Sequence, residues 1–480
     1  MTKYLIRILF SAVIFSVCGF AKAEVKKATV TVDSSARYQK VTGFGGFVCN
    51  GQFQYGWMTT DEIKKLWGKD SEAGYNIMRL YIPSGESSFS QTLSAAQTAK
   101  SLGIILFASP WSMPAAWKTY NTTNSQYKDN NGIVQRNYLQ EAHYADYANY
   151  LNNYVSYLRQ NGVELDAISI QNEPDATVDY AGCYWTPAQL NSFIAKYGSL
   201  ISCRVIAPES IGMTNTYANP LLADSVINNF SIYAGHQYQA IQNGFQQLQA
   251  KGKEAWMTEY LSNWNDTEPV ARNFNWQKDA FIFAGAVNNA LLANVNAWIH
   301  YASKRFYGMI GDNSYGTVSG EITKRGYILS QYAKYTTGST RIKADWTDNS
   351  KMLQGSSFIS PTGDSIIVMV INPSGDDYSL TVDLPFYTKA GKSILTTASV
   401  DMSASDLTID SETLHPEIVI SASSVTTLIF TKSRDITSIP PVVSEKAKDN
   451  TLYDLMGNRI YHPHKNVVYV YKDGRKVIFI

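Results

Sequence analysis

The chain has 480 residues, with 41 lysine and arginine residues against 40 aspartate and glutamate residues, so its formal net charge is +1. That length predicts one large domain with an accessory domain. Hydrophobic residues make up 45% of the chain, which excludes a disordered protein, and the balanced charge excludes the broad basic surface that binds nucleic acid.

The N-terminus has the pattern of an export signal. Lys3 and Arg7 flank an apolar stretch, and Ala21 and Ala23 supply the small residues of a cleavage site. We therefore expect a signal peptide over residues 1–23 and an exported protein, which is secreted, periplasmic or held at the cell surface. No later segment has the run of about 20 apolar residues that crosses a bilayer, so we expect no transmembrane segment.

Residues 41–338 alternate short apolar runs with longer segments of helical period. This alternation predicts strands buried on both faces, and hence a parallel sheet covered by helices. The strand candidates are residues 41–49, 76–82, 103–110, 166–173, 203–209, 231–238, 254–260 and 295–304. Helix candidates include residues 61–67, 91–102, 139–161, 186–200 and 276–293. Eight such units over about 300 residues predict an α/β fold that closes into a (β/α)8 TIM barrel.

The composition changes after the barrel. Residues 339–432 contain alternating apolar runs bounded by glycine, aspartate, asparagine and serine, which predicts an antiparallel β-sandwich. Residues 24–40 include a strand-like segment before the barrel, so we expect both ends of the chain to build this side domain. The polar residues 433–450 predict a linker, and residues 451–480 predict a small β-rich tail.

Two glutamates lie at the downstream ends of apolar runs. Glu173 ends the fourth strand candidate and Glu259 lies near the end of the seventh. Barrel enzymes keep their chemistry at the C-terminal ends of strands. Hydrolysis of a glycosidic bond needs two carboxyl groups there, one to protonate the leaving oxygen and one to stabilise or attack the developing oxocarbenium carbon. Two solvated or capping carboxylates are the alternative.

The cysteine and histidine patterns predict neither a disulfide framework nor a metal site. Cys49, Cys183 and Cys203 follow the signal and are odd in number. A Cys183–Cys203 bridge is compatible with an exported protein, whereas three buried thiols are the favoured interpretation. The six histidines have no metal-ligand spacing, so we expect no metal.

The strand ends carry motifs in a specific order. They are Val-Thr-Gly-Phe-Gly-Gly at 41–46, Ser-Pro-Trp-Ser-Met-Pro at 109–114, Ala-Ile-Ser-Ile-Gln-Asn-Glu-Pro at 167–174, Ile-Ala-Pro-Glu-Ser at 206–210, Gly-His-Gln-Tyr at 235–238, Trp-Met-Thr-Glu at 256–259 and Thr-Lys-Arg-Gly-Tyr at 323–327. From about residue 25 to 432 the chain resembles glycoside hydrolase family 30, and most of all its glucuronoxylanase branch. Those endo-xylanases need a 4-O-methylglucuronic acid branch on the xylan. The resemblance implies a retaining double displacement on a β-xylosidic polymer, without a cofactor.

By this resemblance Glu173 is the acid/base and Glu259 is the nucleophile. The family pattern assigns Asn172 a hydrogen bond to the sugar 2-hydroxyl. Arg79 ends the second strand candidate, where we expect it to orient a carboxylate such as Glu259. Tyr238, on the sixth strand candidate, is expected to donate a hydrogen bond to the nucleophile.

Other polar and aromatic side chains have two interpretations. His236 either orients its neighbours or is a core histidine. Glu209 is a third strand-end carboxylate, which we interpret as structural because its counterpart in the family is not catalytic. Candidate platforms for sugar stacking, with core packing as the alternative, are Trp111, Trp117, Tyr184 and Trp185.

Substrate selection is expected after the last strand. The glucuronoxylanase branch has an Arg-x-Tyr element here that grips the glucuronate carboxylate, and Arg305 and Tyr307 match it. A guanidinium fork suits bidentate binding of a carboxylate. The branch has paired tryptophans where His300 and Tyr301 stand, so Tyr301 is expected to change the stacking beneath the sugar.

These patterns predict an exported, monomeric endo-β-1,4-xylanase whose partner is glucuronoxylan. Alternatives are a family 30 hydrolase of unbranched xylan, β-1,6-glucan or a glucosyl lipid, or a glycan-binding surface protein without catalysis. The loops 175–184 and 311–320 are expected to reshape the cleft and leave the strictness of the glucuronate requirement open. The tail resembles sorting or attachment modules of exported Bacteroidetes-type proteins, with an added hairpin as the alternative.

Overall fold

The computed structural model describes residues 25–52, 56–262, 272–348, 351–436, 451–471 and 474–479. The expected signal peptide and most of the expected linker lie outside these residues. Within them, no helix is both long and apolar enough to span a membrane.

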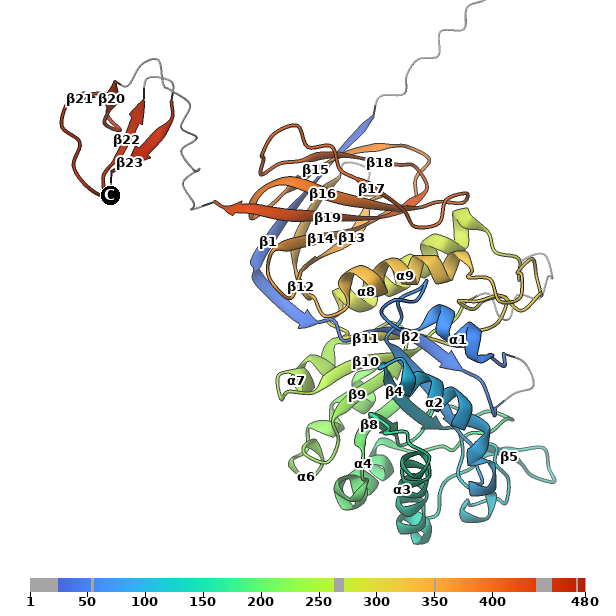
Figure 1. Ribbon diagram of the computed structural model, residues 1–480. Coiled ribbons are helices and arrows are strands. Elements are labelled where there is room, and N and C mark those ends of the chain that lie inside the picture. The colour runs from blue at the N-terminus through green and yellow to red at the C-terminus, as the bar shows by residue number, and fades with distance from the viewer. Residues whose placement is uncertain are drawn as a thin grey trace, which may run out of the picture.

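Eight parallel strands close into a barrel, which confirms the predicted fold class (Figure 1). They are β2 (Gly43–Val48), β3 (Ile77–Ile82), β4 (Ile105–Pro110), β7 (Ala167–Ser169), β8 (Arg204–Ser210), β9 (Ile232–His236), β10 (Glu254–Glu259) and β11 (Ala297–His300). Each overlaps one strand candidate. Inward side chains such as Phe107 and Trp256 fill the barrel, so its axis is a packed core and the strand ends carry the site.

Helices surround the barrel. The longer ones are α1 (Thr60–Leu66), α2 (Leu93–Ser101), α3 (Tyr144–Gln160), α4 (Pro187–Tyr197), α8 (Phe281–Leu292) and α9 (Lys324–Thr336), and the shorter ones are α5 (Asn215–Ala218), α6 (Asp224–Ile227) and α7 (Gln246–Gln249). Capping boxes set the starts of α1 and α4, at Thr59 with Glu62 and at Thr186 with Gln189. The 276–293 candidate begins with a π-helical turn, Trp276–Ala280, before α8.

A nine-stranded sheet forms the side domain, in the order β17-β16-β19-β14-β13-β12-β1-β15-β18. The strands are β1 (Lys26–Lys40), β12 (Thr340–Asp348), β13 (Gln354–Ile359), β14 (Ser365–Asn372), β15 (Tyr378–Asp383), β16 (Phe386–Thr396), β17 (Ser403–Asp406), β18 (Glu417–Ile420) and β19 (Ser424–Asp435). Both ends of the described chain contribute, as predicted. The domain is largely antiparallel, as predicted; one pair differs, since β1 runs antiparallel to β12 but parallel to β15.

Strand β14 joins the two domains through its alternating side chains. Ile366, Val368 and Val370 belong to the side-domain core, whereas Ile367, Met369 and Ile371 belong to the barrel core. Successive side chains of a strand point to opposite faces, so one strand serves both cores. Figure 1 shows α8 and α9 between the barrel and this sheet.

Two small β elements complete the described chain. The hairpin of β5 (Gln126–Lys128) and β6 (Val134–Arg136) lies in the long connection after β4. The tail forms its own antiparallel sheet from β20 (Leu452–Tyr453), β21 (Arg459–Ile460), β22 (Val468–Tyr471) and β23 (Lys476–Ile478). A sorting or attachment role for the tail stays a prediction.

Gln331 on α9 offers a test of the domain interface. Its buried amide donates to the Thr396 hydroxyl at 2.6 Å and accepts from the Thr427 hydroxyl at 2.7 Å. We expect Gln331→Leu to lower the free energy of unfolding by about 1–3 kcal/mol, because buried hydroxyl groups lose a partner. Denaturant titration measures this, with Gln247→Leu at an exposed site of α7 as the control. Equal effects of the two substitutions would contradict the interface role.

Candidate active site

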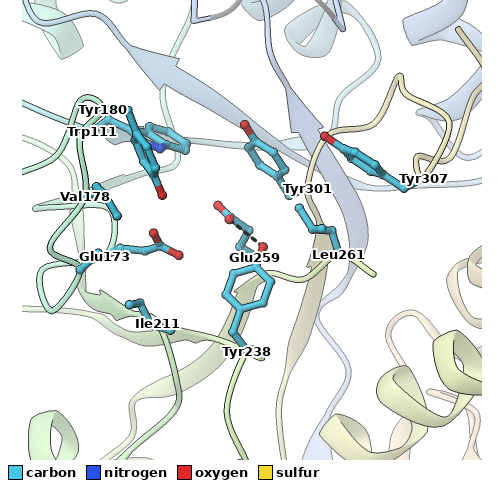
Figure 2. Close-up of a pocket in the computed structure, with 11 residues that line it drawn as sticks. Trp111, Glu173, Val178, Tyr180, Ile211, Tyr238, Glu259, Leu261, Tyr301 and Tyr307 are labelled. Carbon is cyan, nitrogen blue, oxygen red and sulfur yellow. Dashed lines mark hydrogen bonds between the residues drawn. The ribbon is translucent and has the colours of Figure 1, made fainter. Parts of the chain in front are cut away.

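Glu173 and Glu259 meet at the C-terminal end of the barrel. One carboxylate oxygen from each lies within 4.8 Å of the other and of a ring nitrogen of His236. Figure 2 shows the two carboxylates pointing toward one another across a cavity. The cavity has a volume of about 460 Å³ and is lined by Trp111, Glu173, Ala176, Val178, Tyr180, Ile211, Tyr238, Glu259, Leu261, Tyr301 and Tyr307.

The backbone aims Glu173 into this cavity. Its φ is 48°, and that of Glu209 is 57°, so both residues lie in the left-handed region that side chains disfavour. The amide of Glu173 donates to the carbonyl of Glu209 at 2.9 Å, and the amide of Asn172 donates to the carbonyl of Pro110 at 2.8 Å. Contacts with two neighbouring strands thus hold a conformation that would be unfavourable alone.

Arg79 is fully buried beneath the nucleophile candidate. Its Nη1 is 2.5 Å from Oε2 of Glu259, and its Nη2 is 2.6 Å from Oδ1 of Asn172 and 3.1 Å from Oε1 of Glu209. The Trp111 ring lies 4.7 Å from the guanidinium carbon. Burial by itself lowers the pKa of Arg79, but Glu209 and Glu259 raise it by more, so the guanidinium stays charged.

The second oxygen of Glu259 also has a donor. The Tyr238 hydroxyl donates to Oε1 at 2.9 Å, and burial together with the charge of Glu259 raises the phenol pKa, so this donor keeps its proton. Arg79 and Tyr238 therefore hold the two oxygens of Glu259 separately. A carboxylate fixed in this way is oriented for attack or for electrostatic stabilisation.

His236 lies between the two glutamates. Its Nδ1 is 3.0 Å from Oε1 of Glu173 and 3.9 Å from Oε1 of Glu259. Burial lowers the pKa of His236, although Glu259 opposes that effect, so we assign a neutral ring. A neutral imidazole can donate from Nδ1 to an ionised Glu173 or accept from a protonated one, because its tautomer can change.

The two glutamates differ electrostatically. Burial raises the pKa of Glu173 to about 7; Arg79 opposes this shift and Glu209 adds to it. Burial also raises the pKa of Glu259, but His236 and Arg79 oppose it and Arg79 donates to it directly. Groups this close titrate as a pair. The proton of the pair belongs mainly on Glu173, because only Glu259 contacts the cation.

Among the residues that the structure describes, the trio of Glu173, His236 and Glu259 is the one set of titratable groups close enough to share an ion. Both oxygens of Glu259 already accept from Arg79 and Tyr238. The hydrogen bonds of these three side chains therefore indicate an acid–base site formed by the two glutamates, with His236 between them.

The aromatic candidates separate into two groups. Trp111, Tyr301 and Tyr307 line the cavity, and the ring of Tyr301 stacks on Phe47 with centroids 5.2 Å apart. His300 points the other way, toward Trp298 and Phe283.

Trp185 and Tyr184 are not among the residues that line this cavity, and their surroundings favour the alternative interpretation of core packing. Trp185 is 1% exposed in the barrel core and packs on Phe193, while the guanidinium of Arg136 covers the Tyr184 ring at 4.1 Å. Trp117 likewise packs on Tyr150. These three side chains pack against residues of helices and loops and do not line the cavity at the strand ends.

Arg305 lies beside the cavity rather than in its lining. Its guanidinium carbon is 6.0 Å from the ring of Tyr307, and its Nη1 is 3.3 Å from Oδ2 of Asp312. Lys304 turns to a different partner, Glu62, at 2.7 Å.

Sequence reasoning expected the loop 175–184 to reshape the cleft but named neither of the two residues, Tyr180 and Val178, that form this part of the cavity wall. Tyr180 is 45% exposed and lines the cavity with Val178 from the loop after β7. An aromatic residue in the polar segment 175–180, just past Glu173, was the available signal.

A buried amine supports that wall. The Lys118 ammonium donates to the carbonyls of Thr123, Asn124 and Gly182 at 2.9, 2.7 and 2.5 Å, which ties the connection after β4 to the loop after β7. Burial lowers the pKa of Lys118 to about 8.

The three cysteines that the structure describes, Cys49, Cys183 and Cys203, are free thiols. Cys49 and Cys183 are buried, as the favoured interpretation expects, whereas Cys203 is only partly buried. Cys183 and Cys203 are not bridged.

Comparisons with known proteins agree with this geometry. The family model for the glycosyl hydrolase family 30 TIM-barrel domain matches residues 66–198. Glucuronoxylanase XynC of Bacillus subtilis (strain 168) is 30% identical over 368 residues, which cover 74% of this chain and 81% of that protein.

Solved structures extend the likeness to both domains. A GH30 endoxylanase from Clostridium papyrosolvens C71 is 26% identical with a TM-score of 0.69, over 84% of this chain and 100% of that one. The subfamily 8 xylanase Xyn30A from Clostridium acetobutylicum is 25% identical with a TM-score of 0.70, over 84% and 99%. A likeness of fold alone extends to the endo-beta1,6-glucanase BT3312, at 17% identity, a TM-score of 0.62 and 84% and 94% coverage. The chain therefore belongs to glycoside hydrolase family 30 and is a glycoside hydrolase.

Proposed function

We propose that this enzyme is a retaining endo-β-1,4-xylanase that hydrolyses glucuronoxylan and recognises its glucuronic acid branch. The observation that carries the catalytic part is the approach of the Glu173 and Glu259 oxygens to within 4.8 Å. Retaining glycosidases keep their carboxyl groups about 5–5.5 Å apart, whereas inverting ones leave about 6.5–9.5 Å for a water. The similarity to XynC and to two xylanase structures supports the choice of substrate.

Glu173 is the proposed acid/base and Glu259 the proposed nucleophile. In the first step the Glu173 proton moves to the leaving glycosidic oxygen while an oxygen of Glu259 bonds to the anomeric carbon. In the second step Glu173, now ionised, takes a proton from water, which displaces Glu259 from that carbon. Both proton transfers use Glu173, so the enzyme returns to its starting state.

The neighbours of the pair suit this cycle. Arg79 and Tyr238 hold Glu259 ionised and oriented before attack. Formation of the glycosyl ester removes the charge of Glu259, which lowers the pKa of Glu173 and makes it a base at the step that needs one. Asn172, whose Oδ1 accepts from Arg79, is the proposed partner of the sugar 2-hydroxyl.

The cavity walls suit a sugar chain. Trp111, Tyr180, Tyr301 and Tyr307 line the cavity with flat rings that can stack on pyranose faces while phenol groups hydrogen-bond to hydroxyls. Arg305, next to Tyr307, is the proposed reader of the branch carboxylate, because a guanidinium binds carboxylates in a fixed planar geometry.

We further propose that the enzyme acts outside the cytoplasm as a monomer. The signal-like residues 1–23 and a polymeric substrate that cannot cross a membrane support this assignment. A second candidate activity, hydrolysis of unbranched xylan, is favoured by one observation: Arg305 lies outside the cavity lining and is paired with Asp312.

Replacement of the nucleophile tests the catalytic assignment. We expect Glu259→Gln to lower kcat on glucuronoxylan by about 10³-fold or more, because an amide cannot form the glycosyl ester. Reducing-sugar release measures this, and a circular dichroism spectrum like that of the parent shows that the variant folds. Activity close to that of the parent would remove Glu259 from the proposed role.

The pH profile tests the division of roles. Because the acid must be protonated and its pKa is about 7, kcat/KM should fall tenfold per unit above about pH 7. The nucleophile must be ionised and burial raises the pKa of Glu259, so the acid limb should lie above the ordinary glutamate range. On an aryl xylobioside whose leaving group needs no protonation, Glu173→Gln should lose the alkaline limb. An alkaline limb that persists in this variant would assign the acid elsewhere.

Branch recognition is tested by digesting glucuronoxylan and the same polymer after enzymatic removal of glucuronate. We expect Arg305→Ala to lose roughly 2–5 kcal/mol of transition-state binding on the branched polymer and little on the stripped one. Mass spectrometry should find one glucuronate on each product of the parent enzyme. Equal cleavage of both polymers by the parent would favour the unbranched-xylan activity.

A further inference from the structure

Arg305 is held by a carboxylate of its own chain. Its backbone is fixed in a turn, where its amide donates to the carbonyl of Ile310 at 3.1 Å and its carbonyl accepts from Gly308 at 2.9 Å. Its side chain, 28% exposed, meets Asp312 at 3.3 Å from Nη1 to Oδ2. Asp312 lies in the loop 311–320 between β11 and α9.

The Asp312 carboxylate is fixed independently of Arg305. Its Oδ1 accepts from the amide of Ser314 at 3.1 Å and from the Ser314 hydroxyl at 2.5 Å, and its own amide donates to the Thr317 hydroxyl at 3.2 Å. The side chain of Asp312 is 12% exposed. Oδ1 of Asp312 is therefore hydrogen-bonded within the loop, whereas Oδ2 faces Arg305.

The whole loop is also anchored. The amides of Gly311 and Gly320 close its base through the carbonyls of Glu321 and Gly311 at 2.9 and 3.2 Å. The ring of Tyr315 packs on Phe306 with centroids 4.5 Å apart. The loop is thus fastened to the same 305–307 segment that carries the arginine, so the Arg305–Asp312 contact has a rigid frame.

We propose that Asp312 is a positioning residue for branch recognition, which holds the Arg305 guanidinium beside Tyr307 so that it meets the substrate carboxylate already oriented. This inference rests on the proposed function. An arginine side chain has many rotamers and loses that freedom when it binds. A neighbouring carboxylate that restricts the rotamers beforehand lowers this cost and sharpens the geometry.

The neighbouring cation supplies a contrast. Lys304 pairs with Glu62 at 2.7 Å, and its side chain is only 17% exposed. It has the same charge as Arg305 and adjoins it in sequence, but no contact directs it toward Tyr307. Lys304→Met therefore removes one local positive charge without disturbing the Arg305–Asp312 pair, which makes it a matched control.

The test compares kcat/KM on glucuronoxylan with kcat/KM on the same polymer stripped of glucuronate, for the full chain and its variants. Asp312→Asn keeps the size of the side chain and the Oδ1 acceptor for Ser314 but removes the charge that faces Arg305. We expect the ratio of the two kcat/KM values to fall about tenfold, with the value on stripped polymer unchanged. Ser314→Ala, which loosens Asp312 without touching Arg305, should lower the ratio about threefold. Lys304→Met should leave the ratio unchanged.

Coupling is measured in the background of Arg305→Ala. There, Asp312→Asn should have no further effect on the ratio, because the residue it positions is gone. A ratio that rises in Asp312→Asn would mean that Asp312 competes with the branch carboxylate, and an unchanged ratio would mean that it does not act on Arg305; either result overturns the proposal. An equal loss on both polymers would assign Asp312 a purely structural role. If the parent ratio is near one and Arg305→Ala leaves it there, branch recognition itself fails, and the role given to Asp312 fails with it.

Discussion

The site depends on one buried cation. Arg79 comes from β3, has no exposed surface, and contacts Glu259, Glu209 and Asn172 from three other strand ends. A buried guanidinium is stable only when carboxylates compensate it, and carboxylates at the bottom of a cavity need such a cation in turn. The mutual requirement ties four strands of the barrel into one electrostatic unit. Removing Arg79 would leave two buried carboxylates without their cation, so the architecture and the chemistry are not separable here.

Charge balance within this unit explains why two chemically identical side chains can take different roles. Glu209 and Glu259 share the single guanidinium by direct contact, and Glu173 contacts His236 instead. Burial penalises every charge, so the carboxyl group without the cation keeps its proton longest. The proposed division into an acid and a nucleophile therefore follows from which glutamate contacts Arg79.

Backbone strain is part of the same arrangement. The positive φ values of Glu173 and Glu209 are unfavourable backbone conformations. The hydrogen bond from the amide of Glu173 to the carbonyl of Glu209 helps to hold both conformations in place. The side domain contributes indirectly. Its strand β14 packs on the barrel through every second side chain, which makes α8 and α9 a fixed layer. Helix α9 follows the loop that carries Asp312, so the packing between α9 and the side domain fixes the end of that loop.

The amino-acid sequence alone determined much of this protein, because periodicity and strand ends are local properties. Eight apolar runs with intervening helices predicted the barrel, and Glu173 and Glu259 could be singled out because they end two of these runs. The direction of a side chain, by contrast, depends on residues elsewhere in the fold. Trp111 lines the cavity whereas Trp185 lies in the core, although both follow barrel strands. Their rings pack on Arg79 and Tyr144 respectively, partners far away in the chain. The parallel pairing of β1, the place of Tyr180 in the cavity wall and the contact between Arg305 and Asp312 were likewise decided only in three dimensions. The pairing of β1 with β15 joins distant parts of the chain in the side domain, and Tyr180 lines the cavity together with residues of other βα units. Arg305 and Asp312 belong to one connection, and the fold of that connection brings their side chains together.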